Sequence, residues 1–130
     1  MKKEFDRWCC YKKRLNDKND KEIVFFRKRE IWWCALGVNI GREQDGKNKT
    51  FERPVLILRK VNRHLILVVP LSTKIKKYQH YCTYKFEDKK YSALLLQMRI
   101  ISSKRLLRKV GSLTQEEFLK ISNGVNKFIL

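Results

Sequence analysis

From residue 31 onward the sequence is a succession of short strand-like runs separated by polar turns, and this pattern constrains the fold more than any other feature. The run 64–69 is almost continuously apolar, which is typical of a central strand buried on both faces. Several short strands at this spacing indicate a β-barrel or β-sandwich. The expected strands are 31–36, 54–58, 64–69, 78–86 and 91–100.

The connections between these strands are polar. Residues 37–52 form a long basic loop punctuated by glycines, long enough to be functional or mobile. Its glycines do not make a nucleotide-binding pattern such as GxGxxG. Pro54 should begin its strand or lie at a sheet edge, and residues 87–90 are expected to form a charged turn.

An amphipathic segment precedes the strands. Phe5, Trp8 and Leu15 recur at helical spacing within 3–15, and the turn formers of 16–20 end the pattern. Either the helix packs on the main domain through Phe5 and Trp8, which we favour, or it is an arm that binds RNA or a partner. We therefore divide the chain into a basic helical extension, 1–28, and a barrel domain, 29–130.

A second helix is expected at the C-terminus. Thr114 and Glu117 have the spacing of a capping box. A short helical turn is expected over 102–106. The overall expectation is a mainly β fold with helices (α+β). The residues expected to cover the barrel are Phe118, Ile121, Val125 and Phe128.

Positive charge dominates the composition. The chain has 31 Lys and Arg against 13 Asp and Glu, a net charge of +18. Residues 1–29 hold only 11 of the basic and 5 of the acidic residues, so the barrel segment is itself basic. This excess favours a polyanionic partner, most often nucleic acid, over a charge that serves solubility alone.

Cysteine and histidine give little sign of a metal or cofactor site. The four cysteines include the adjacent pair Cys9 and Cys10, and no CxxC motif occurs. We find no convincing catalytic role for His64 or His80. The Lys-rich start of the chain does not resemble a signal peptide, and the apolar run 65–71 is too short to span a bilayer. We expect no metal, no cofactor, no membrane association and a reducing cytoplasmic setting.

Several short motifs occur in a fixed order along residues 29–113. They are Arg29-Glu30-Ile31-Trp32-Trp33 with Gly37 and Gly41-Arg42-Glu43-Gln44; Arg53-Pro54-Val55; Val68-Val69-Pro70-Leu71-Ser72-Thr73; and Leu95-Leu96-Gln97-Met98-Arg99-Ile100 through Leu106, with Val110-Gly111-Ser112-Leu113. Together they resemble the MazF/PemK toxins of type II toxin–antitoxin systems. The chain departs from the family pattern at Ser102, where many members have Asp, and in its longer first loop.

The resemblance implies an SH3-like barrel of the kind found in MazF, PemK and CcdB. It further implies a homodimer. It also implies a single-stranded RNA substrate cut at short sequence motifs and a cognate antitoxin as partner. Operator DNA would be bound only through the antitoxin complex. An RNA chain can be cut without a metal when its own 2′-hydroxyl attacks the adjacent phosphate.

The resemblance also suggests which residues act. Arg53 corresponds to the family's catalytic arginine and would stabilise the phosphate, and it is a candidate proton donor as well. Ser72, or Thr73 if the alignment slips by one residue, would supply a hydroxyl, although Ser72 is equally suited to end the strand in a turn. Glu43 is a candidate base or a partner that holds Arg53. Candidate substrate-binding residues are Arg99, Gln44, Lys47, Lys49 and Gln97.

Two other functions fit the same sequence. A basic SH3-like barrel could bind nucleic acid or protein without cleaving it, because fold does not fix function. A CcdB-like protein would act on DNA gyrase, but the Arg53-Pro54-Val55 and Leu95–Arg99 segments argue against it.

Overall fold

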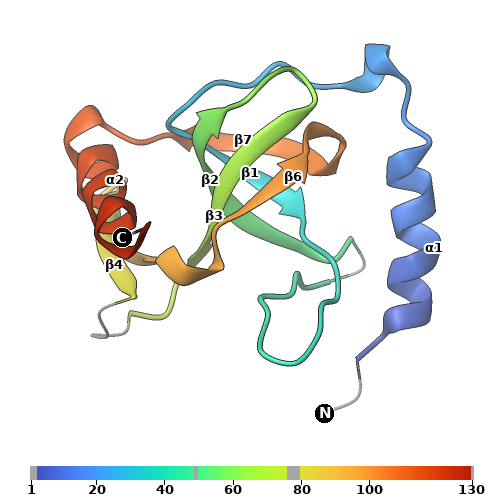
Figure 1. The fold of residues 1–130 in the computed structure, drawn as a ribbon, viewed down its shortest axis with the longest axis horizontal. Helices are drawn as coiled ribbons and strands as arrows, with labels where there is room; N and C mark the ends of the chain where they lie inside the picture. The colour runs from blue at the N-terminus through green and yellow to red at the C-terminus, as the bar shows by residue number, and fades with distance from the viewer. Residues whose placement is uncertain (1–2, 49, 76–79, 130) are drawn as a thin grey trace.

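The computed structural model describes residues 3–48, 50–75 and 80–129, and it places an antiparallel sheet between two helices (Figure 1). The elements are α1 (Phe5–Asn16), β1 (Glu30–Ala35), β2 (Glu52–Lys60), β3 (Leu65–Ser72), β4 (Tyr81–Phe86), β5 (Lys89–Leu94), β6 (Arg99–Ser102), β7 (Leu106–Ser112) and α2 (Gln115–Ile129), with 3₁₀ turns η1 (Asp20–Glu22), η2 (Leu95–Gln97) and η3 (Ser103–Arg105). The strand order is β4-β5-β3-β2-β1-β7, and β6 pairs with β3 beside this path. The expected mainly β fold with flanking helices is confirmed.

The middle of the sheet is formed by β2 and β3, which are apolar on both faces. Val55 and Ile57 of β2 pack in one buried cluster, whereas Leu56 and Leu58 pack in another. β3 alternates in the same way and pairs with β2, β5 and β6. The expectation of a central strand over 64–69 is therefore confirmed.

The segment expected to be one strand, 91–100, is divided in the structure, so that prediction is wrong. Ser92 pairs with Ser72, and Arg99 pairs with Val68, which lies only four residues away along β3. The three additional residues on the β5–β6 side are taken up by η2. β5 and β6 thus lie along the same edge of β3 and are separate strands.

One strand, β7, has no counterpart in the sequence prediction. Of its residues only Leu106 is buried, so no apolar alternation marks it. Its pairing with β1 is irregular, with register shifts next to Trp32 and Trp33. Pro54 lies near the start of β2. It is paired with Trp33 of β1, whereas the pairing of β2 with β3 reaches only as far as Val55. Its place near the start of the strand, unpaired on one side, agrees with the expectation.

The chain reverses tightly between β4 and β5. Glu87 and Asp88 both have positive φ, 50° and 64°, as the two central residues of a tight hairpin turn require. The turn is shorter than the expected 87–90, because β5 begins at Lys89. The first residues of the expected strand 78–86 lie partly outside the described residues, and β4 begins at Tyr81.

α2 covers one face of the sheet. The Thr114 hydroxyl accepts a hydrogen bond from the Glu117 amide at 3.3 Å, which is half of the expected capping box. The Glu117 carboxylate does not return to Thr114; it accepts from the Lys85 amide of β4 at 2.7 Å and so ties the helix to the sheet. Three of the four predicted covering residues are buried and one is partly buried, in the order Phe118, Ile121, Val125 and Phe128.

α1 lies on the side of the sheet away from α2 (Figure 1). Trp8 and Leu15 are buried against Ala35 and Phe51, so the helix packs on the main domain as we favoured. Phe5 does not take part, because 49% of its surface is exposed, and its predicted packing role is wrong.

The cysteines differ in burial. Cys34 is fully buried, which raises its pKa to about 12, whereas Cys9 and Cys10 are exposed. Among the described residues, no group of three His, Cys, Asp or Glu side chains is placed to hold a metal ion. Neither described helix is long and apolar enough to cross a membrane.

Candidate active site

A groove of about 370 Å³ opens where the start of β2 and the end of β3 meet the loop between β1 and β2. Arg53 enters it from β2, and Ser72 and Thr73 enter it from the end of β3. The antiparallel pairing of Val55 with Pro70 explains this, since it sets the neighbouring ends of the two strands side by side. The guanidinium and the two hydroxyls that the sequence singled out thus share one groove.

Arg53 is held in place by acceptors from two directions. Its Nε–H donates to the Asp45 carbonyl at 2.9 Å, and Nη1 donates to the Leu71 carbonyl at 3.2 Å. The side-chain oxygen of Gln44, in the orientation that satisfies both groups, accepts from Nη2 at 2.7 Å and from Nε at 3.1 Å. A guanidinium has five N–H groups, so these contacts leave one on each terminal nitrogen for a ligand.

The Arg53 guanidinium is a cation in a partly desolvated place. Burial lowers its pKa, and the negative charge of Asp45 opposes that shift. Because an arginine stays protonated in proteins, the charge remains and is poorly hydrated. Such a group, already fixed in orientation, is suited to bind a phosphate with two parallel hydrogen bonds.

The hydroxyl residues Ser72 and Thr73 line the same groove. Ser72 Oγ accepts a hydrogen bond from the Lys74 amide at 3.2 Å, which is the strand-ending turn considered from the sequence. This contact uses an acceptor lone pair and leaves the Ser72 O–H as a donor. Thr73, the next residue, is exposed and also lines the groove. Both residues that the sequence offered as the source of the hydroxyl therefore lie there.

A carboxylate that the sequence analysis missed forms part of the groove wall. Glu52 is only 8% exposed and makes a bidentate ion pair with Arg108 of β7, with both N–O distances 2.9 Å. The Arg108 guanidinium also lies 5.1 Å from the ring centre of Trp33. Because Arg108 already neutralises Glu52, the positive charge of Arg53 is left for a ligand. Other groove residues not predicted are Trp33, Asn48, Lys74 and Tyr81.

The position of Glu52 next to Arg53 in the sequence could have pointed to it. Nothing in the sequence pointed to Arg108 as its partner. Arg108 is 56 residues away and belongs to the unpredicted strand β7. Only the strand order β2-β1-β7 brings the two side chains together.

Three other predicted residues line a neighbouring pocket of about 330 Å³. Glu43, Gln97 and Arg99 are among its residues, and Gln44 is common to it and the groove. The Glu43 carboxylate accepts from the Ile40 amide at 2.8 Å. The expectation that Glu43 holds Arg53 is therefore corrected, because Gln44, Asp45 and Leu71 supply the contacts described above.

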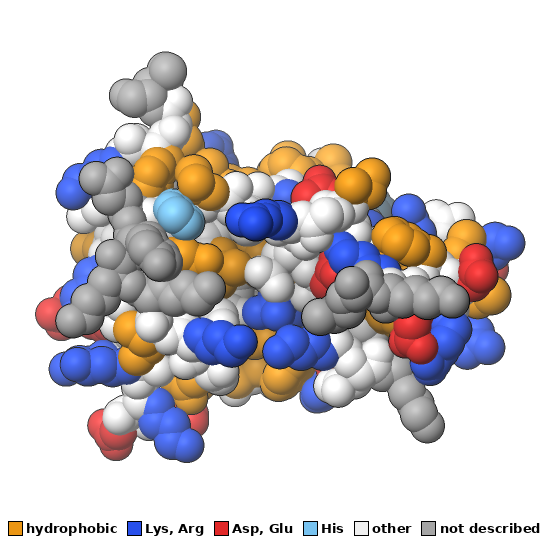
Figure 2. Space-filling view, turned by 90° about the horizontal axis from the view of Figure 1, so that it is seen from below, with side chains coloured by type: hydrophobic (Ala, Val, Ile, Leu, Met, Phe, Trp, Pro, Cys, Tyr) orange, Lys and Arg blue, Asp and Glu red, His pale blue; other side chains and the backbone are white. Residues whose placement is uncertain are grey.

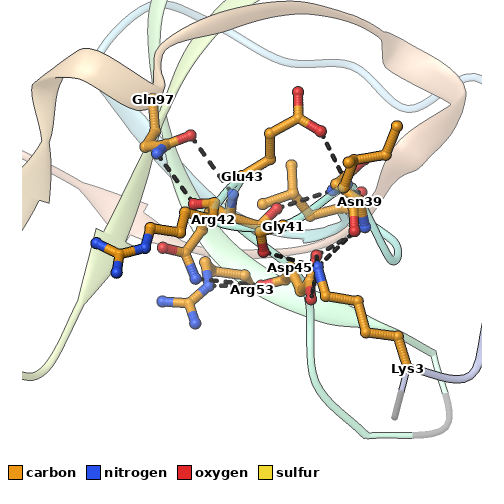
Figure 3. Close-up of polar contacts among 11 residues, drawn as sticks. Lys3, Asn39, Gly41, Arg42, Glu43, Asp45, Arg53 and Gln97 are labelled. Atoms are coloured by element: carbon orange, nitrogen blue, oxygen red, sulfur yellow. Dashed lines mark hydrogen bonds and ion pairs between the residues drawn. The ribbon is translucent and has the colours of Figure 1, made fainter. Parts of the chain in front are cut away.

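The remaining predicted residues have varied surroundings. Gln97 accepts from the Gln44 amide and donates to the Arg42 carbonyl, both at 3.4 Å (Figure 3). Among the ion pairs of the described residues none includes Arg99. Lys47 lines the groove, and Lys49 lies outside the described residues.

Ser102, the departure from the family pattern, has a local structural role. Its Oγ accepts from the Lys104 amide at 3.2 Å and caps η3. Serine and aspartate serve this capping function equally well. The residue is not among those that line the groove.

The surface around these elements is basic. Lys and Arg side chains are spread over the face seen in Figure 2, and several lie side by side across its middle. A surface on which positive charge is in excess attracts polyanions.

Comparison with known proteins gives a consistent result. Residues 27–129 match a family described as PemK-like, MazF-like toxin of type II toxin–antitoxin system. No curated protein matches the sequence.

Solved structures with a similar fold include several toxins. A MazF structure from Deinococcus radiodurans is 17% identical with a TM-score of 0.67, and the match covers 82% of this chain and 97% of that one. An endoribonuclease in complex with its cognate antitoxin, from a mycobacterial species, is 14% identical with a TM-score of 0.63 and coverage of 81% and 95%. The Mycobacterium tuberculosis toxin MazF-mt6 is 21% identical with a TM-score of 0.57 and coverage of 78% and 98%. The fold that the sequence motifs implied is thereby confirmed.

Proposed function

The chain belongs to the PemK-like, MazF-like toxin family of type II toxin–antitoxin systems, and from this premise we propose that it is an endoribonuclease that cuts single-stranded RNA at short sequence motifs without a metal ion. The observation that carries the proposal is the groove that a fixed Arg53 guanidinium, with two N–H groups left over, shares with Ser72 and Thr73. A groove of this kind suits a phosphodiester.

The proposed reaction needs no nucleophile from the protein. The ribose 2′-oxygen attacks the adjacent phosphorus as its proton is removed, the bond from phosphorus to the 5′-oxygen breaks, and that oxygen is protonated. The products are a 2′,3′-cyclic phosphate and a 5′-hydroxyl. Arg53 stabilises the negative charge that builds on the phosphoryl oxygens. Ser72 or Thr73 donates a hydrogen bond to a phosphoryl oxygen or orients the 2′-hydroxyl.

Two residues are candidates for the proton transfers. Arg53 remains a candidate donor to the leaving 5′-oxygen. Glu43 remains a candidate base, although it lines the neighbouring pocket. The residues proposed to contact RNA on either side of the cut are Arg99, Gln97, Gln44 and the lysines of the loop.

We further propose that the protein acts in the cytoplasm, inhibits growth and is neutralised by a cognate antitoxin, with operator DNA bound only through that complex. One similar structure is that of an endoribonuclease with its cognate antitoxin, which supports the partner.

A homodimer is also proposed, and an exposed apolar surface supports it. Ile100 of β6 lies opposite Leu67 of β3, and Leu65 points to the same face two residues away. Leu65, Ile100 and nearby Leu96 are all large apolar residues exposed to solvent in the single chain. A second copy would cover this surface.

The decisive test is cleavage of a long unstructured RNA by the purified full-length protein in EDTA. We expect cleavage that leaves cyclic phosphate ends and that falls by about 10²- to 10³-fold in Arg53→Ala, the loss typical of one preorganised charge contact. Arg59→Ala is the matched control, because Arg59 is an exposed arginine at the other end of β2. Intact RNA with a folded protein would instead favour the non-catalytic binding module.

Growth provides an independent check. Expression of the wild-type chain should arrest growth, expression of Arg53→Ala should not, and co-expression of the product of the neighbouring gene should relieve the arrest.

A further inference from the structure

The segment just before α1 reaches the loop that supports the groove. The Lys3 amino group forms an ion pair with Asp45 Oδ2 at 3.0 Å, donates to the Gly41 carbonyl at 3.0 Å and donates to the Asn39 carbonyl (Figure 3). An ammonium has three N–H donors, so all three find acceptors in one loop. Lys3 is 21% exposed, which is low for a lysine.

Asp45 connects Lys3 to Arg53. Its carboxylate binds Lys3 and accepts from the Asn39 amide at 2.7 Å, while its backbone carbonyl accepts from Arg53 Nε at 2.9 Å. Gln44, the preceding residue, accepts from Nη2 and from the same Nε of the guanidinium. Lys3 is thus linked to Arg53 through a single residue, Asp45.

Trp8 of α1 secures the two ends of the same loop. A Cβ added to Gly37, which has φ +87°, would lie 2.2 Å from the Trp8 ring, so the indole packs directly on the loop's first turn. The ring lies 5.5 Å from Phe51 at the loop's end, in an edge-to-face arrangement. The ring is also 5.5 Å from the Arg105 guanidinium, which donates to the Ala35 carbonyl at 3.2 Å.

We propose that α1 and the residues just before it stabilise one conformation of the β1–β2 loop, residues 36–51. Within this segment, Lys3 is a positioning residue for Arg53. A loop of this length has many conformations of similar energy, and each fixed residue costs about 1–2 kcal/mol of conformational entropy. The strands hold the ends of the loop, and Gln97 and Arg53 contact its middle. Lys3, just before α1, adds three contacts to the same middle part, so that Gln44 and Asp45 meet Arg53 before RNA binds.

This role is separate from the features by which the family is recognised. The family match begins at residue 27, so α1 lies outside it. That boundary also supports our proposed division of the chain at residue 28. The catalytic part of the inference rests on the proposed function, whereas the structural part is measurable without RNA.

The test compares Lys3→Ala, Lys3→Arg and Lys12→Ala in the full-length protein. Lys12 is an exposed lysine on α1, so its loss changes the charge equally. We expect Lys3→Ala to lower kcat about tenfold with little change in KM, within the range of energies transmitted through such a contact network. Lys3→Arg should restore most of the rate, and Lys12→Ala should stay within about twofold of wild type.

A second measurement does not depend on cleavage. The Nε–H of Arg53 gives its own signal in a nitrogen–proton correlation spectrum, and we expect its exchange with water to be several-fold faster in Lys3→Ala than in wild type or Lys12→Ala. The Asn39 amide, which donates to Asp45, should behave in the same way. If wild type cuts no RNA, these exchange rates still decide whether Lys3 orients Arg53.

Three results would overturn the inference. The first is unchanged exchange of both groups in Lys3→Ala. The second is faster exchange with an unchanged kcat in an active enzyme. The third is an equal loss of RNA affinity in Lys3→Ala and Lys12→Ala, which would make α1 an RNA-binding arm.

Discussion

α1 and α2 flank the same sheet on opposite sides, but they are attached to it in different ways (Figure 1). α2 buries Phe118, Ile121 and Val125 among residues of the strands themselves. α1 buries Trp8 and Leu15, chiefly against the ends of the β1–β2 loop. α2 therefore completes the core, whereas α1 packs mainly on a loop and adds to the contacts that hold it.

The largest effect should come from the α2 side. Ile121 is fully buried, so Ile121→Ala removes apolar contacts and leaves a cavity. We expect a loss of about 4 kcal/mol in the free energy of unfolding, measured by denaturant titration. The remaining folded protein should keep its specific activity. A loss of activity without a loss of stability would contradict the conclusion that α2 completes the core.

Trp8→Ala is the corresponding change on α1. The cluster around Trp8 is small, and we expect a loss of about 3 kcal/mol, at the lower end for such a truncation. Here activity per folded molecule should fall as well, because the loop loses its anchor. Amide exchange mapped along the chain should rise in the 36–51 loop and remain slow in β2 and β3; a uniform rise would assign α1 to the core.

Gly37→Ala tests the contact between Trp8 and the loop directly. The new methyl group would overlap the indole at a positive φ, and we expect a cost of about 2 kcal/mol from overlap and backbone strain. In the background of Trp8→Ala the overlap disappears, so the same substitution should cost less. A double-mutant cycle on thermal stability measures this coupling, and strict additivity would contradict the packing.

The smallest effect concerns pH and α2. The hydrogen bond from Lys120 and that from the Lys85 amide lower the pKa of Glu117. A carboxyl with a lowered folded pKa stabilises the protein above its unfolded value of about 4.3, and this contribution is lost as the pH falls through the folded value. Glu117→Gln should therefore lower stability by about 0.5 kcal/mol at pH 7, and the loss should be smaller at pH 3. Melting curves at the two pH values provide the measurement, and an equal loss at both would remove the charge from the explanation.

Part of the site was readable in the sequence. The motifs directed attention to Arg53 and to Ser72 with Thr73, and the structure brings these residues into one groove. The same motifs gave Glu43 a place beside Arg53 that the loop conformation gives to Gln44 and Asp45. A short motif fixes which residues are near one another in the chain, but the direction in which each side chain points depends on the loop backbone.

The fold was readable to a similar extent. Helical spacing predicted both helices, and an apolar run predicted the central strand β3. β7 was missed because its side chains are mostly exposed, and its place is fixed by pairing with β1 instead of by burial. The division of 91–100 was missed because β3 pairs with both β5 and β6 at a stagger that no local pattern records.

Local interactions within a few residues of the chain specify the two amphipathic helices and the apolar strands, and composition specifies the basic surface. The contacts that join these elements come from the folded chain: Glu52 pairs with Arg108, 56 residues away, and Lys3 binds Asp45, 42 residues away. The physical reason is that periodicity records which face of an element is apolar. The partner of a polar side chain depends on strand order and loop conformation, which are set by the packing of the whole chain.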